Sequence, residues 1–461
     1  MQPGARLRRD LGTLEAYAAL IGILIGAGIF KVTSQSWALT GPSVILAHLV
    51  LAVPVLATSV PYCVFLSTPL GLEPGGEYAH ISRTFGGRGV AFVGAWLKCI
   101  SYIGALAFLA ATFADYLGGL APGTLDGASA RTSTALASLV LVYAIHIVGV
   151  RWFGRLQVAM LAVLGLSIVV LVVPGLFAVH LSHYRPFFTH GLPGFAAAMP
   201  PLFFAYAGFE SLAQTAGEVR DSTRRLPRIF LLGIGGTTVV YLLMSVVTFG
   251  VLPGPRLQAS AAPMAEVAAV YLPGGAATFV TLGALMALAT SLNSTMMVPS
   301  RLAVVLAEDG LVPRWIGAVS PRTGTPVAAL TLTLAASALL LVGGQIALGL
   351  NIAVFALVGL YLLHSLALLL LPAMNPALFR TVTVSIPIGV QRAAAVVSIA
   401  AMGALFLLQV RSDLGMLATR SLGERIAGGS LTAVELSAVW AVVGALLYAV
   451  GRRRAAGLPE G

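Results

Sequence analysis

The stretch IGILIGAGIF, Ile21 to Phe30, places Gly22, Gly26 and Gly28 inside a long apolar run. Two glycines separated by one residue weaken a helix, because glycine adopts other backbone conformations readily and has no side chain to pack. We therefore predict a break near the middle of this helix. A break in hydrocarbon leaves N–H and C=O groups unpaired, which costs several kcal/mol each unless another group binds them.

The whole chain has the composition of a polytopic membrane protein. Of its 461 residues, 58% are hydrophobic and only 9% are charged, whereas soluble chains are usually about a quarter charged. Apolar stretches of about 18–25 residues predict twelve helical spans, the fourth of them short. Their ranges are 15–36, 42–66, 89–118, 134–149, 152–178, 195–217, 229–252, 276–307, 326–343, 346–372, 391–410 and 432–451.

The net charge of +11 is an orientation signal and does not indicate nucleic-acid binding. Nineteen of the 27 basic residues fall on one set of loops and tails, and six fall on the other. Basic residues gather on the cytoplasmic side of membrane proteins, so this asymmetry places both termini in the cytoplasm. We expect an integral protein of the prokaryotic plasma (inner) membrane, in contact with lipid.

Several chemistries have no support in the sequence. Cys63 and Cys99 both fall in spans, so no disulfide-linked partner subunit is expected. The chain has no Walker loop, HExxH motif or paired CxxC, and no clustered nucleophile, acid–base or metal ligands. We therefore expect no cofactor, no metal and no enzymatic activity. The first span lacks a signal-peptide cleavage site and is interpreted as retained.

A second break is predicted in the sixth span, within PPLFFAYAGFES (200–211). Gly208 lies just before Glu210, and about five spans separate this break from Gly28. The first span runs outward and the sixth inward, as in inverted five-helix repeats with discontinuous first helices. The predicted division is 1–178 for the first repeat, 179–372 for the second, and 373–461 for two further spans and a short tail.

Two facing breaks would form a receptor for a zwitterion. N–H groups at the start of a half-helix suit a carboxylate, and carbonyls at the end of another half-helix suit an ammonium group. The alternative is that the glycines only allow close helix packing, and Gly22 and Gly26 have the small-xxx-small spacing of such contacts. The matching break beside Glu210 favours a binding site.

Four motifs, in order, resemble the amino acid–polyamine–organocation (APC) superfamily of transporters, which includes the amino acid permeases. They are IGAGIF (25–30), GLEPGGEYAHISRTFGGRGVAFVGAW (71–96), FFAYAGFESLAQTAGEVRDSTRRLP (203–227), and SLNSTMMVPSRLAVVLAEDGLVPRW followed by PRTGTPVAAL (291–330). The third motif departs from the family pattern, since Asp221-Ser222 stands where Asn-Pro is usual. Beyond about residue 330, the last two spans match only as apolar helices.

The resemblance implies an all-α, leucine-transporter-type fold with five plus five inverted spans, two additional helices, and alternating access for amino acids or related amines. It assigns the substrate carboxylate to the backbone of Ala27 and Gly28, with Gly26 as a further contributor. It assigns the substrate ammonium to the carbonyls of Leu24, Phe204 and Ala207, and makes Phe204 an aromatic gate. The small side chains of Ala105, Ala205 and Ala207 favour neutral amino acids.

The resemblance also makes Glu210 the candidate for proton coupling. A carboxylate at bilayer depth is costly and usually faces a cavity; the alternative is a structural hydrogen bond to a neighbouring helix. Many relatives carry a lysine in the fifth span, at the position of Leu164 or Gly165, but this span has none. Lys98 could supply that ammonium from the third span, and snorkelling to the cytoplasmic surface is its favoured alternative.

Three mechanisms remain open from the sequence. The coupling ion could be H⁺; it could be Na⁺ held by span-1 carbonyls and the hydroxyls of Thr290 and Ser291, although such hydroxyls more often bond to their own backbone. Exchange without an ion is the third. We interpret the chain as a secondary active transporter, proton-coupled or an exchanger. The rivals are a sodium symporter and, from another class, a transport-inactive amino acid sensor.

Overall fold

The computed structural model describes residues 11–456, apart from 74, 121, 122, 124, 126, 215 and 261. In this part of the chain the regular structure is helical, with one isolated β-bridge. The α-helices are α1 (Thr13–Leu24), α2 (Thr33–Thr40), α3 (Val44–Leu66), α4 (Glu77–Phe85), α5 (Arg88–Leu120), α6 (Ala128–Val148), α7 (Val150–Gly175), α8 (Gly191–Phe203), α9 (Ser211–Gln214), α10 (Ser222–Val251), α11 (Gly254–Ala259), α12 (Pro263–Tyr271), α13 (Gly274–Glu308), α14 (Val327–Val342), α15 (Ile346–Met374), α16 (Pro376–Phe379), α17 (Ile388–Thr419), α18 (Leu422–Ala427) and α19 (Ala433–Ala456).

Ten helical stretches of the described chain are long and apolar enough to cross a membrane. One of them, Thr13–Leu66, joins the first two predicted spans, and the ninth predicted span is the shorter apolar helix α14. All twelve predicted segments are therefore helical, which confirms the all-α class. The number of crossings and the inverted-repeat relation stay predictions.

The fourth predicted span is longer than expected. Its apolar run begins near residue 134, but α6 begins at Ala128 and has 21 residues. The additional turn is polar, and Arg131 in it donates from Nε to the Leu125 carbonyl at 3.0 Å and lies 3.8 Å from Asp115. A hydropathy count misses such a turn because hydrogen bonds and charge contacts, and not apolar side chains, stabilise it.

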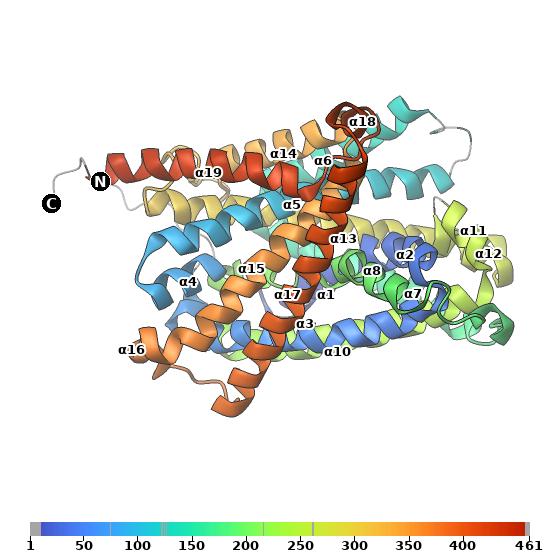
Figure 1. Cartoon of the computed structure of the whole chain (residues 1–461), viewed down its shortest axis with the longest axis horizontal. Helices are drawn as coiled ribbons and strands as arrows, with labels where there is room; N and C mark the ends of the chain where they lie inside the picture. Colours follow the sequence, from blue (N-terminus) through green and yellow to red (C-terminus); the bar gives the residue numbers. More distant parts are fainter. Residues whose placement is uncertain are drawn as a thin grey trace.

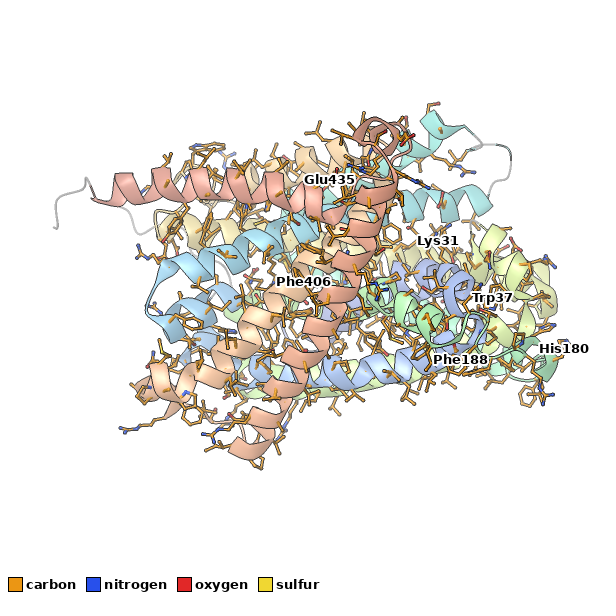
Figure 2. All side chains as sticks on the ribbon, viewed as in Figure 1. Lys31, Trp37, His180, Phe188, Phe406 and Glu435 are labelled. Atoms are coloured by element: carbon orange, nitrogen blue, oxygen red, sulfur yellow. The ribbon has the colours of Figure 1, made fainter. Side chains whose placement is uncertain are left out.

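The helices lie mostly along the long axis of the molecule, and α17 crosses that direction at a slant (Figure 1). The short helices α4 and α16 lie at one end, and α11 and α12 lie at the other. This separation agrees with the predicted topology, in which the first pair belongs to cytoplasmic loops and the second to an external loop. Trp37, Phe188 and His180 lie toward the end that carries α11 and α12 (Figure 2).

Burial separates central from peripheral helices. In the most apolar window of Thr13–Leu66 and of α5, 72% of the residues are buried inside the protein, against 11% in α19. Helix α5 packs against both α13 and α15, and α3 packs against α10. The predicted site therefore lies among helices that are covered by protein, while α19 presents apolar side chains outward.

The β-bridge joins the start of the first span to the segment after the sixth. The amide of Leu11 donates to the carbonyl of Glu218 at 3.0 Å, and the amide of Arg220 donates to the carbonyl of Leu11 at 3.0 Å. We refer to this pair of main-chain hydrogen bonds as the clasp. Beside it, Arg301 of α13 and Glu218 form an ion pair at 3.1 Å in which both side chains are 1% exposed.

Candidate functional site

The first span is broken where the glycines predict. Helix α1 ends at Leu24, Ile25 has the non-helical dihedrals φ −80° and ψ 83°, and a short π-helix, Gly28–Val32, leads into α2. The first N–H groups of a helix have no acceptor within it. A second set of such donors therefore begins at Gly28, in the interior of the bundle.

The sixth span is also broken. Helix α8 ends at Phe203, a 3-10 turn covers Phe204–Tyr206, Ala207 is extended, and Gly208 has a φ of +101°. Only glycine adopts such a φ without steric cost. Helix α9 then begins at Ser211, so both predicted discontinuities are present.

The two breaks lie directly against each other. A Cβ atom on Gly28 would lie 2.2 Å from Cα of Ala205, and one on Gly208 would lie 2.9 Å from the side chain of Ile23. The absence of these side chains is what allows the two backbones to approach. Gly26 serves close packing as well, since a Cβ there would lie 2.1 Å from Oγ of Ser291 on α13.

One hydroxyl lies between a carbonyl from each break and shares its single proton between them. The hydroxyl of Tyr241 on α10 lies 2.5 Å from the carbonyl oxygen of Leu24 and 2.6 Å from that of Ala205. The amide of Gly26 also donates to the Leu24 carbonyl, at 2.9 Å. Tyr241 therefore holds the ends of the two interrupted helices together.

We expect Tyr241→Phe to lower the stability of the folded protein. The change removes the hydroxyl beside the Ala205 carbonyl, whereas the Leu24 carbonyl keeps the Gly26 amide. A buried polar group left unpaired costs about 1–3 kcal/mol. Thermal unfolding of the purified protein in detergent measures the loss. Tyr143→Phe is the matched control, because its hydroxyl contact with Thr331 is exposed. Equal unfolding temperatures for the two variants would contradict the assigned role of Tyr241.

A small cavity of about 30 Å³ lies where the breaks meet. The predicted residues Leu24, Gly26, Ala27, Gly28, Ala105, Phe204, Ala207 and Ser291 line it. Ala205, Thr290, Lys98 and Glu210 are not among the lining residues, and Ala205 packs against Gly28. Gly208, predicted as the second break, also lines the cavity. The sequence missed the lining residues Ile23, Ser101, Tyr102, Leu109, Thr295, Ala353 and Leu357. Their residue types were visible, but their helical faces were not.

Glu210 is completely buried and lies one hydroxyl away from the cavity. Its Oε1 accepts a hydrogen bond of 2.6 Å from Tyr102, which lines the cavity. Its Oε2 accepts from the hydroxyl of Tyr361 on α15 and from the amide of Gly208 at 3.1 Å. The carboxyl group therefore ties the broken sixth span to α5 and α15, as the structural alternative expected.

Lys98 does not snorkel to the surface. Its side chain is 1% exposed, and Nζ lies 2.9 Å from Oε1 and 2.8 Å from Oε2 of Glu77. The expectation of snorkelling is wrong because Glu77, the first residue of α4, reaches into the bundle and pairs with the ammonium group. An acid in the glycine-rich stretch GGEY was the signal that sequence reasoning missed.

Glu77 also accepts hydrogen bonds from two other helices. The hydroxyl of Tyr62 lies 2.7 Å from its Oε1, and Nε2 of Gln214 lies 2.8 Å from its Oε2. Burial alone would raise the pKa of the Glu77 carboxyl, but the charge of Lys98 and the hydrogen bonds from Lys98 and Tyr62 outweigh it and lower that pKa. Glu77 and Lys98 form a buried salt bridge.

A separate polar group lies between the first, fifth and eighth spans. The hydroxyls of Thr290 and Ser291 each donate to the carbonyl of Gly22 at 2.9 Å, and that of Thr290 also bonds back to Ala287 at 2.7 Å. The two predicted sodium ligands thus lie beside span-1 carbonyls, as proposed. Here, however, they act as hydrogen-bond donors.

The polar residue of the fifth span in this region is Gln157, which the sequence did not single out. Its Nε2 donates to the carbonyl of Thr290 at 3.1 Å and to Oγ of Ser294 at 2.9 Å, while its Oε1 accepts from Asn293 at 2.8 Å. Leu164, one of the two positions expected for the family lysine, is buried, whereas a Cβ on Gly165 would meet only open space.

Interrupted helices that face each other around a buried cavity, within a bundle of apolar spans, define a membrane transporter. A family model described as amino acid permease matches residues 11–422, and the chain therefore belongs to the amino acid permease family. This confirms the resemblance predicted from the four motifs. The protein is an integral membrane protein and a transporter, not an enzyme.

Characterised and uncharacterised relatives support the same family. The chain is 30% identical over 327 residues to an uncharacterized transporter of Mycobacterium tuberculosis, covering 69% of this chain and 70% of that protein. It is 25% identical to a branched-chain amino acid permease of Bacillus subtilis over 70% and 72% of the two chains. It is 28% identical to Asc-type amino acid transporter 1 of Mus musculus over 82% and 73%.

Proposed function

We propose that this protein is a secondary active transporter that moves amino acids across the prokaryotic plasma membrane by alternating access, with both termini in the cytoplasm. The observation that carries the proposal is the contact between the two broken spans around one buried cavity. The names of the relatives, a branched-chain amino acid permease and an Asc-type amino acid transporter, point to the same substrate class.

The cavity supports recognition of the backbone of an amino acid. N–H groups at Ala27 and Gly28 would bind the carboxylate, and the carbonyls of Leu24, Phe204 and Ala207 would bind the ammonium group. Each carbonyl oxygen has two lone pairs, so the Leu24 oxygen can accept from a substrate while it accepts from Tyr241.

The surrounding side chains favour a neutral substrate. Ala105, Leu109, Phe204, Ala353 and Leu357 contribute apolar surface to the lining of the cavity. The present volume of about 30 Å³ holds about two water molecules. The walls must therefore separate for an amino acid to enter, which is the movement that alternating access requires.

Glu210 is the proposed proton carrier. An ionised carboxylate in a protein interior is costly without a compensating positive charge, and a proton taken from water removes that cost. Tyr102 lines the cavity and donates a hydrogen bond to Glu210. A change in the protonation of Glu210 therefore alters the hydrogen bonding of a hydroxyl group that faces the substrate. Transport coupled to H⁺ follows if the protonated state is the one that binds substrate.

Uptake into proteoliposomes tests this proposal. Labelled amino acids would be supplied with an inward proton gradient, an inward sodium gradient, or no gradient, for the unmodified protein and for Glu210→Gln. We expect the proton gradient to increase accumulation of a neutral amino acid and the variant to lose that increase while it retains exchange with preloaded substrate. Stimulation by protons in both proteins would rule out Glu210 as the carrier.

Sodium coupling has one observation in its favour, the approach of Thr290 and Ser291 to the span-1 carbonyls. The same assay separates it from proton coupling. Stimulation by sodium alone, lost in the double variant Thr290→Ala/Ser291→Ala, would replace H⁺ with Na⁺ as the coupling ion. Exchange without stimulation by either ion would indicate an exchanger. Substrate binding without any uptake would indicate the transport-inactive sensor.

A further inference from the structure

Three buried ionisable side chains around Tyr102 come from different elements. Glu77 begins α4, Lys98 lies on α5, and Glu210 lies in the broken sixth span. Lys98 is one helical turn before Tyr102, and its Nζ lies 5.6 Å from the centre of the Tyr102 ring. Since the Tyr102 hydroxyl bonds to Glu210 and Lys98 bonds to Glu77, contacts between buried side chains join all three ionisable residues into one group.

The other titratable groups around Glu210 are tyrosines and a pair of histidines. They are Tyr102 of α5, Tyr361 of α15 and Tyr62 of α3, with the hydrogen-bonded pair His80 of α4 and His364 of α15 beyond Tyr62. The two histidine rings contact each other through Nδ1 of His80 and Nε2 of His364 at 2.9 Å, which requires at least one unprotonated nitrogen. Lys98 is thus the one lysine or arginine among the described residues of this group.

We infer that Glu77 determines whether Glu210 has to bind a proton. The Glu77 carboxylate pairs with the positive charge of Lys98, so that this charge does not neutralise an ionised Glu210. The bidentate contact of Lys98 with Glu77 makes a neutral pair, which leaves Glu210 without a counter-charge. The three-residue group is therefore neutral only when Glu210 carries a proton or when a cation binds nearby. This inference rests on the proposed transport function and adds Glu77 as the residue that makes a proton on Glu210 necessary.

The charge balance predicts different behaviour for a single and a double substitution. In Glu77→Gln, Lys98 loses its carboxylate and is free to neutralise an ionised Glu210, so the group is balanced without a proton. In Glu77→Gln/Lys98→Met, the ammonium is removed as well, and Glu210 again needs a proton. The double variant should therefore restore the protonation of Glu210 that the single variant loses. A merely structural role for Glu77 does not predict this recovery.

The protonation state can be measured without transport. Infrared spectroscopy of the purified protein at neutral pH distinguishes a protonated carboxyl group from a carboxylate, and subtraction of the Glu210→Gln spectrum isolates the band of Glu210. We expect this band in the unmodified protein, its loss in Glu77→Gln and its return in Glu77→Gln/Lys98→Met. Glu266→Gln is the control, because it removes a carboxylate from an exposed ion pair, that of Arg256 and Glu266.

Proton-driven uptake provides a second measurement on the same variants. Stimulation by the inward proton gradient should disappear in Glu77→Gln and return in the double variant. A protonated Glu210 that persists in Glu77→Gln, or that is missing from the double variant, overturns the inference whatever the uptake assay shows. Failure of the unmodified protein to take up or exchange any amino acid would instead overturn the proposed function, and the infrared result would still decide the charge balance.

Discussion

Gly28→Ala is expected to reduce saturable amino acid uptake by up to about 100-fold. The new Cβ would lie 2.2 Å from Cα, 2.6 Å from Cβ and 2.9 Å from the backbone nitrogen of Ala205. Two of these three atoms are backbone, so the two broken helices have to move apart. Such overpacking costs about 1–3 kcal/mol, and about 1.4 kcal/mol corresponds to a factor of ten in affinity. Concentration-dependent uptake into proteoliposomes measures the effect.

A glycine in open surroundings provides the control for this prediction. Gly165 lies inside α7, where an added Cβ meets no atom within 4 Å. Gly165→Ala should therefore transport normally, since alanine is the better helix former. Size-exclusion profiles and thermal unfolding of both variants separate a damaged site from a misfolded protein. Normal uptake by Gly28→Ala would show that contact between the two breaks is not required for transport.

Arg301→Met is expected to lower the stability of the protein by about 3–5 kcal/mol, because it leaves the buried carboxylate of Glu218 without its counter-charge. Both side chains of this ion pair are 1% exposed, and Nε of Arg301 lies 3.1 Å from Oε1 of Glu218. Replacing both charges removes the uncompensated group, so Arg301→Met/Glu218→Gln should recover most of the loss. Chemical or thermal unfolding in detergent gives the comparison.

An exposed ion pair provides the comparison, because water reduces the contribution of such a pair to the stability of the protein. Arg256 and Glu266 are 3.6 Å apart with side chains 65% and 40% exposed. Pairs of this kind contribute about 0–1 kcal/mol, so Arg256→Met should leave stability almost unchanged. If Arg301→Met were equally harmless, water would have to reach Glu218, and the burial described for this ion pair would be incorrect.

The fold was largely predictable from the sequence because the bilayer imposes a simple rule of length and hydropathy. Each of the twelve apolar segments is helical, and the glycines at 26, 28 and 208 lie where the helices are interrupted. The errors occur where hydropathy is not the deciding force. Helix α6 begins six residues before its apolar run, in a polar turn whose Arg131 contacts Leu125 and Asp115.

The cavity was predictable in part. Residues of both predicted breaks line the cavity. They could be predicted because the positions of glycine and proline determine where the backbone of a helix is interrupted. Tyr102 and Ala353 were not identified, since the rotation of a helix about its axis is set by its neighbours and not by its own sequence. The pairing of Lys98 with Glu77 was missed for a related reason: the two residues belong to different elements, and only the packing of α4 against α5 brings them together.

The clasp between Leu11 and the segment 218–220 has an evolutionary consequence. Its two hydrogen bonds use peptide groups alone, and a peptide group is the same in every residue except proline, which lacks the N–H. Substitutions can accumulate at Leu11 and Arg220 as long as the N–H donors survive and the neighbouring side chains still pack. At Glu218 the ion pair with Arg301 has to be kept as well. The amino-acid sequence of both segments can therefore diverge during evolution while the main-chain hydrogen bonds between Leu11 and residues 218–220 are retained.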